Sequence, residues 1–172
     1  MNTKDIEKEG LKVLKKYLCA QGFHIITDCI EYGCDLIATK DGRKYYIELK
    51  AAANASPTNL RFTHQTISKM GEKKELKNLI VAHAYNLFSG KPNIKFFKIS
   101  CSAHLFVEPH FIIQPHKQQN LLYDDIDSVI SADIDTAHWQ KIEKVIEDTI
   151  KVRDESQKVW SKNRCAPQAE MR

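Results

Sequence analysis

Residues 35–50, DLIATKDGRKYYIELK, decide the fold that this sequence predicts. The segment holds two apolar runs separated by Asp41-Gly42, a dipeptide typical of two-residue β-hairpin turns. With the turn at these two positions, residues whose numbers add up to 83 face each other, so that Lys40 pairs with Arg43. The segment therefore predicts two antiparallel strands in a fixed register.

This register brings three ionisable side chains together. Asp35 lies opposite Glu48, with Cβ atoms roughly 4.5–5.5 Å apart, and Lys50 points to the same face because it is two residues beyond Glu48. Two carboxylates that close repel each other unless a proton or a cation lies between them. Mg²⁺, or Mn²⁺ as a substitute, suits such oxygen ligands, and a backbone carbonyl near Leu49 supplies a further one. Lys50 would then orient an attacking water or stabilise charge on phosphoryl oxygens.

A simpler interpretation makes Asp35 and Glu48 charges at the edge of a sheet, with Lys50 as a salt-bridge partner. The strand around Glu48 is otherwise apolar on both faces, which is typical of a central strand. An acid there needs a partner, so the pattern leaves both interpretations open.

The rest of the chain predicts an α/β fold with a mixed central sheet flanked by helices and a C-terminal helical extension. We expect a core over 1–115 and, over 116–172, an acidic linker and an amphipathic helix packed on the core or on a partner. Thr3 is the expected first N-cap. We expect helices over 3–20, 61–75 and 136–160, and strands over 23–27, 35–39, 44–50, 79–84, 94–99 and 111–114. Residues 115–135 are polar, and we expect them to be irregular, with Asp124, Asp125 and Asp127 in a solvated loop.

The two strands carry a motif of a known family. An acid in Gly33-Cys34-Asp35, followed by Glu48-Leu49-Lys50 on the next strand, resembles the PD-(D/E)xK phosphodiesterase superfamily, the restriction-endonuclease-like nucleases. The resemblance covers about residues 3–100, and the proline that many members have before the first acid is absent. It implies a restriction-endonuclease-like core and a Mg²⁺-dependent DNA endonuclease, acting in bacterial or phage DNA processing or defence.

The resemblance also implies further site residues. The family often adds a metal-binding glutamate from the first helix, and Glu7 fits better than Glu9 because it falls within the apolar stripe. Gln65 stands where some relatives carry a glutamine that positions water or contacts phosphate. Arg61 and Lys69, with Lys50, are the expected contacts to DNA phosphates; each of these residues could equally belong to an ordinary polar surface.

The amino-acid composition limits the kinds of protein that this chain can be. The chain has 172 residues with 42% hydrophobic and 28% charged, which is typical of a soluble globular protein. Residues 1–100 hold 17 Lys and Arg against 10 Asp and Glu, a net +7, whereas residues 101–172 hold 9 against 12, a net −3. The basic part favours a polyanion partner. The lack of a signal peptide or a membrane-spanning run, and five cysteines without a paired motif, predict a cytoplasmic protein with no membrane partner.

Two other functions compete with the nuclease. The same fold could be a catalytically silent subunit that binds nucleic acid or docks into a larger machine, and the acids could be merely solvated in a structural or immunity-type protein. An enzyme that cuts both DNA strands would most simply be a homodimer. Cys101, His104, His110 and His116 match no structural zinc spacing.

Overall fold

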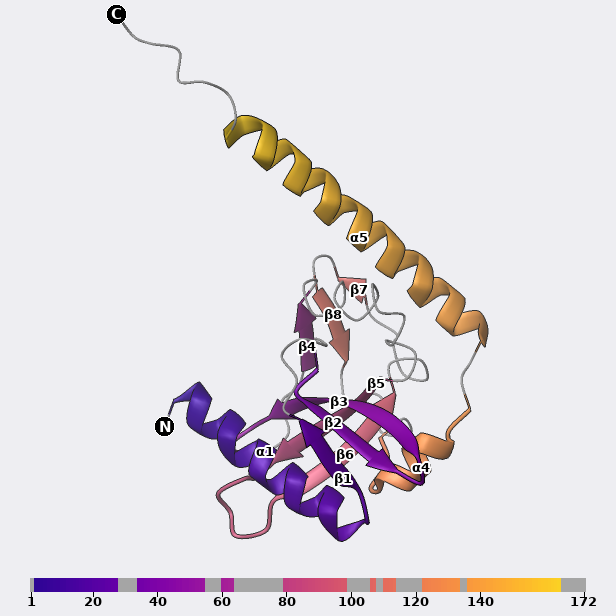
Figure 1. Ribbon diagram of the computed structural model, residues 1–172. Helices are drawn as coiled ribbons and strands as arrows, with labels where there is room; N and C mark the ends of the chain where they lie inside the picture. Colours follow the sequence, from indigo (N-terminus) through magenta and orange to yellow (C-terminus); the bar gives the residue numbers. More distant parts are fainter. Residues whose placement is uncertain are drawn as a thin grey trace, which may run out of the picture.

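The computed structural model describes residues 2–27, 34–54, 60–63, 79–98, 106–107, 110–113, 122–133 and 136–164. Figure 1 shows its elements in chain order: α1 (Thr3–Ala20), β1 (His24–Thr27), β2 (Leu36–Lys40), β3 (Arg43–Ala51), β4 (Leu60–Thr63), β5 (Leu79–Tyr85), β6 (Asn93–Lys98), β7 (Phe106–Val107), β8 (His110–Ile113), α4 (Ile126–Ser131) and α5 (Thr136–Arg164). The predicted α/β class is confirmed.

Two sheets organise the strands. The larger has the order β1-β2-β3-β5-β6, and the smaller has the order β4-β8-β7. Within the larger sheet, β3 and β5 pair parallel and every other neighbouring pair is antiparallel, so the sheet is mixed. A parallel pair needs a crossover connection, which residues 52–78 provide between β3 and β5.

The β2–β3 hairpin has the predicted turn and register. Asp41 and Gly42 both have positive φ, 51° and 73°, as a two-residue type I′ turn requires. Lys40 pairs with Arg43, and the ladder continues to Leu36. The local chemistry of the turn thus fixes which residues of β2 and β3 share a face.

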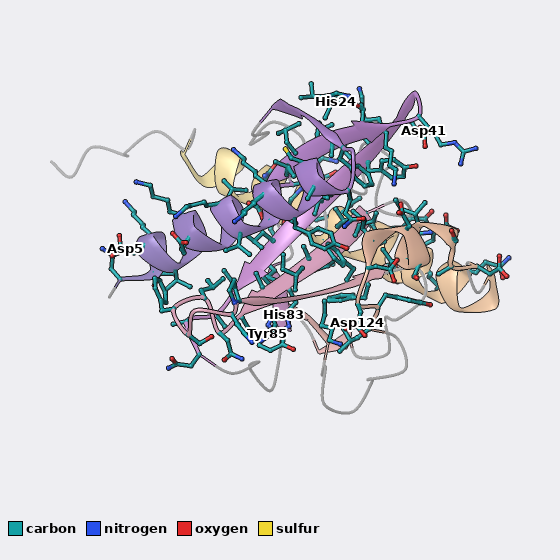
Figure 2. The ribbon with its side chains drawn as sticks, turned by 90° about the horizontal axis from the view of Figure 1, so that it is seen from below. Asp5, His24, Asp41, His83, Tyr85 and Asp124 are labelled. Atoms are coloured by element: carbon teal, nitrogen blue, oxygen red, sulfur yellow. The ribbon has the colours of Figure 1, made fainter. Side chains whose placement is uncertain are left out.

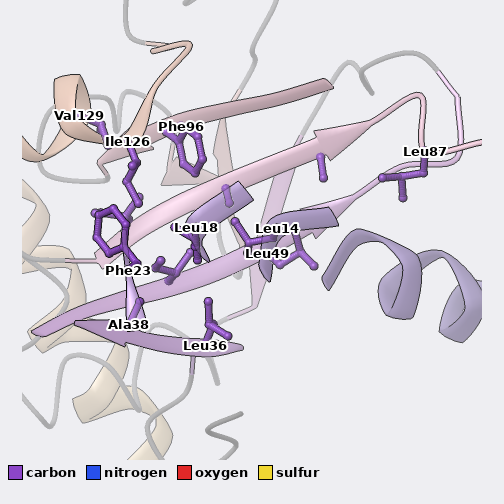
Figure 3. Packing of buried hydrophobic residues seen from close by; sticks show 14 residues of the cluster. Leu14, Leu18, Phe23, Leu36, Ala38, Leu49, Leu87, Phe96, Ile126 and Val129 are labelled. Carbon is purple, nitrogen blue, oxygen red and sulfur yellow. The ribbon is translucent and has the colours of Figure 1, made fainter. Parts of the chain in front are cut away.

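Helix α1 covers one face of the larger sheet, here called the α1 face. Its buried residues are Gly10, Leu14 and Leu18, the predicted stripe. A Cβ atom built on Gly10 would lie 2.7 Å from the Cβ of Ala51, so glycine lets the helix approach the end of β3. The core on this face, drawn in Figure 3, contains Leu14, Leu18, Phe23, Leu36, Ala38, Ile47, Leu49, Ile80, Ala82, Ala84, Leu87, Phe96, Ile126 and Val129.

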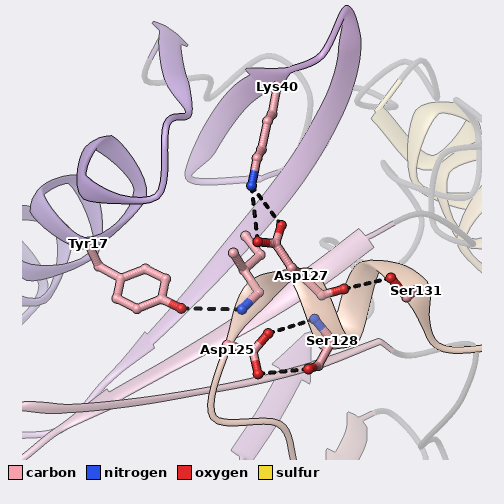
Figure 4. Close-up of polar contacts among 7 residues, drawn as sticks. Tyr17, Lys40, Asp125, Asp127, Ser128 and Ser131 are labelled. Carbon is pink, nitrogen blue, oxygen red and sulfur yellow. Dashed lines mark hydrogen bonds and ion pairs between the residues drawn. The ribbon is translucent and has the colours of Figure 1, made fainter.

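Helix α4 also belongs to this core, and the expectation of an irregular, solvated loop there was wrong. Ile126 and Val129 are fully buried, and the side chain of Asp125 caps the helix by accepting from the backbone N–H of Ser128. The Tyr17 hydroxyl accepts from the N–H of Ile126 at 3.3 Å, and Lys40 pairs with Asp127 at 2.9 Å (Figure 4). An acidic run therefore supplies a helix cap and an ion pair.

Three further expectations need correction. The N-cap of α1 is Asn2 rather than Thr3, because Asn2 and Asp5 form a reciprocal capping box. The expected helix over 61–75 begins in strand β4, whose residues pair with β8 far along the chain. The last helix runs on to Arg164 and projects beyond the smaller sheet (Figure 1).

Within the described parts of the chain, no helix is long and apolar enough to cross a membrane.

Candidate active site

The second face of the larger sheet, here called the site face, carries the predicted cluster. Strand β2 begins at Leu36, so Asp35 lies just before it, and the N–H of Asp35 donates to the carbonyl of Ile47 at 3.1 Å. The Asp35 carboxylate turns towards β3, where its Oδ2 accepts from the N–H of Leu49 at 2.7 Å. This bond fixes an exposed carboxylate beside Glu48.

Glu48 and Lys50 form an ion pair within β3. The Lys50 Nζ lies 2.7 Å from the Glu48 Oε1, as two alternate residues of a strand allow. The Glu48 side chain is 9% exposed and that of Lys50 is 25% exposed. The sheet thus holds a buried acid, a partly accessible ammonium and the exposed Asp35 at one end of β3.

The buried acid has an unusual pKa. Burial raises the pKa of Glu48 to about 7, and the nearby negative charge of Asp35 adds to this rise, while the Lys50 ammonium opposes it. The pairing of Leu36 with Ile47 continues the hairpin register, which puts Asp35 opposite Glu48. Near neutral pH the Glu48 carboxyl group therefore holds a proton part of the time, mainly because it is buried.

The donor set fits a hard divalent cation. Asp35 and Glu48 are oxygen ligands, and the Leu49 carbonyl belongs to the same stretch. Among the described residues, no group of three or more His, Cys, Asp or Glu side chains could hold a metal ion. Mg²⁺ commonly binds through one or two carboxylates together with waters and substrate phosphates, so a site with two acids is chemically sufficient.

The structure does not bring the two first-helix acids to this cluster. Glu7 is exposed, contrary to its expected place within the apolar stripe, because the helix buries its first residue only at Gly10. Glu9 is half-buried and pairs with Lys12 at 3.3 Å. Arg61 lies in β4, and Gln65 and Lys69 lie outside the described residues.

One residue of the site face was not predicted. His83 on β5 pairs in register with Lys50 on β3, so both side chains point to the same face. His83 is 1% exposed, and among the described residues its Nε2 atom has no hydrogen-bond partner. The sequence does show His83 as the one ionisable residue in the apolar run Leu79–Ala84. A single histidine in a buried strand is common, however, so this pattern alone does not indicate a functional residue.

No known protein family matches this chain, and no curated protein matches it.

Proposed function

We propose that this chain is a divalent-cation-dependent phosphodiesterase that cuts DNA. The observation that carries the proposal is the convergence of Asp35, Glu48 and Lys50 at the end of one hairpin. Asp35 is held by the Leu49 N–H, and Glu48 is held by Lys50. Helix α1, the antiparallel β1-β2-β3 arrangement and the parallel β5 support a restriction-endonuclease-like core.

Each residue has a role that its surroundings support. Asp35 and Glu48, with the Leu49 carbonyl, would hold the Mg²⁺ ion, whose chemistry is to lower the pKa of a bound water and to neutralise phosphate charge. Asp35 is exposed and can meet substrate without rearrangement of the sheet. Lys50 is partly exposed and can donate to a water or a phosphate oxygen, which stabilises the charge that develops at phosphorus.

Cleavage of supercoiled plasmid by the full chain with Mg²⁺ tests the proposal. We expect wild type to nick or linearise the DNA, and EDTA to stop it. Asp35→Asn and Lys50→Met should lower the rate by about a hundredfold or more, since each removes one charged group from the reacting centre. Lys44→Met removes an exposed lysine from the same strand and should leave the rate unchanged.

Two results would overturn the proposal. One is equal cleavage by wild type, Asp35→Asn and Lys50→Met, which would mean that a contaminant or another site cuts the DNA. The other is a wild type that binds Mg²⁺ but cuts neither plasmid, nor linear or single-stranded DNA, nor RNA.

A second candidate is a catalytically silent subunit that binds nucleic acid or docks into a larger assembly. The observation that favours it is the exposure of Glu7, which leaves the candidate site with two acids. Titration calorimetry with Mn²⁺ separates the candidates: saturable binding that Glu48→Gln abolishes supports the enzyme, and no binding supports the silent subunit.

A further inference from the structure

His83 lies next to the candidate site without serving it in the mechanism above. Its register partner on one side is Lys50 of β3, and on the other side it is Lys95 of β6. Neighbouring strands are about 4.8 Å apart, so a lysine on either side can reach the imidazole. Lys95 already forms an ion pair with Asp124.

Burial restricts what His83 can do. At 1% exposure it lies deeper than Lys50, so it does not meet a substrate directly. It also does not form a metal-binding group with Asp35 and Glu48, since the described residues contain no such group of three. A buried polar atom without a partner costs free energy. A hydrogen-bond donor on a neighbouring strand that moved towards His83 Nε2 would therefore be stabilised by it.

Lys50 is such a donor. Its ammonium now contacts the Glu48 carboxylate, which is also a proposed ligand of the cation. If that carboxylate held a divalent ion, the like charge of the ion would weaken the contact between the Lys50 ammonium and Glu48. We propose that His83 is a positioning residue whose Nε2 atom accepts a hydrogen bond from Lys50 when the Glu48 carboxylate engages a divalent cation. This inference rests on the proposed function through the metal site, but it does not require DNA cleavage.

The state of the imidazole supports this role. Burial lowers the pKa of His83 to about 4, so the ring is neutral at neutral pH and has one nitrogen able to accept. The ring packs against that of Tyr85, with ring centroids 5.0 Å apart (Figure 2). A fixed, neutral acceptor keeps a lysine at the site without competing for its proton.

Nitrogen NMR of the imidazole tests the inference on the full chain. We expect the His83 Nε2 resonance to be that of an unprotonated nitrogen, and to move upfield on saturation with Mg²⁺ as it accepts a hydrogen bond. Lys50→Met keeps the length of the side chain but removes the donor, so it should abolish the movement. Lys95→Met, the matched control on β6, should leave the movement intact.

The outcomes separate this inference from the proposed function. If Mg²⁺ binds but Nε2 does not move, or moves equally in Lys50→Met, the role of His83 is refuted while the metal site stands. If Nε2 moves as expected but no nucleic acid is cut, the role stands and the nuclease proposal fails. If Mg²⁺ does not bind, both fail.

Kinetics give a second measurement where cleavage is observed. His83→Phe keeps the buried ring but removes the acceptor, and should lower kcat about tenfold with KM unchanged, because Lys50 is misplaced. His83→Gln restores an acceptor and should recover most of the loss. In the Lys50→Met background His83→Phe should have no further effect; an additional loss there would contradict a role through Lys50.

Discussion

Glu48 and His83 are ionisable side chains buried on the same sheet face, and burial moves their pKa values in opposite directions. The pKa of Glu48 rises from 4.5 to about 7, so the folded protein binds a proton that the unfolded chain releases between these pH values. The pKa of His83 falls from 6.5 to about 4, so the unfolded chain binds a proton that the folded protein excludes. Glu48 therefore makes stability fall as pH rises, and His83 makes it rise.

Each of the two pKa shifts changes the free energy of unfolding by about 3 kcal/mol across its pH range, because one pKa unit is worth about 1.4 kcal/mol. Their windows overlap between pH 4.5 and 6.5, where they nearly cancel in the metal-free protein. We predict that the free energy of unfolding of Glu48→Gln, relative to wild type, rises by about 3 kcal/mol from pH 4.5 to 7. For His83→Phe, the same difference should fall by about 3 kcal/mol from pH 4 to 6.5.

Urea denaturation across this pH range checks both slopes. Glu7→Gln changes an exposed carboxylate outside the site and is the control. If the free energy of unfolding depends on pH in the same way for wild type and both site variants, neither Glu48 nor His83 changes its proton affinity on folding. Burial would then not raise the pKa of Glu48, which contradicts its proposed role as a buried ligand of a cation.

At the scale of elements, the position of the site depends on how closely α1 approaches β3. Gly10 faces Leu49 and Ala51, the residues that alternate with Glu48 and Lys50 along the strand. A methyl group at Gly10 would lie 2.7 Å from the Ala51 Cβ, which requires the helix or the strand to move. The helix therefore supports the site from the opposite face of the sheet.

We predict that Gly10→Ala destabilises the protein by about 1–3 kcal/mol, because overpacking outweighs the gain of roughly 1 kcal/mol in helix propensity. Lys8→Ala, an exposed substitution in the same helix, should change the stability by less than about 0.5 kcal/mol. Thermal or urea unfolding measures both. A Gly10→Ala protein more stable than wild type would show that α1 does not pack as closely as the structure has it.

How well each element could be predicted depends on how far apart in the sequence its interacting residues lie. The hairpin could be predicted because Asp41-Gly42 fixes its turn locally, and with it the side of Asp35, Glu48 and Lys50. Strand β4 could not, because its pairing with β8 joins residues about fifty positions apart. Helix α4 was missed because six residues in an acidic run carry too few apolar positions to show a helical period.

At the scale of the whole molecule, part of the charge asymmetry is satisfied within the chain. Asp124 and Asp127 from the acidic part pair with Lys95 and Lys40 from the basic part. The ammonium of Lys98 donates to the carbonyl of Ile130 at 2.8 Å. These lysines contact the segment around α4. Fewer positive charges are therefore left for a polyanion than the net charge of residues 1–100 suggests.

The burial of α4 has a measurable consequence for folding. Ile126 is fully buried in the core that α1 and the sheet share, and Tyr123 and Phe96 exchange two backbone hydrogen bonds of 2.8 Å. We predict that Ile126→Ala costs about 2–5 kcal/mol in a single cooperative transition, because it leaves a cavity in that shared core. Asp127→Asn, one residue away, removes only a surface ion pair and should leave the transition almost unchanged. Urea denaturation followed by circular dichroism in the far and near ultraviolet measures both variants. If Ile126→Ala unfolds like wild type, or in two separate steps, α4 is an appendage and not part of the core that α1 shares with the larger sheet.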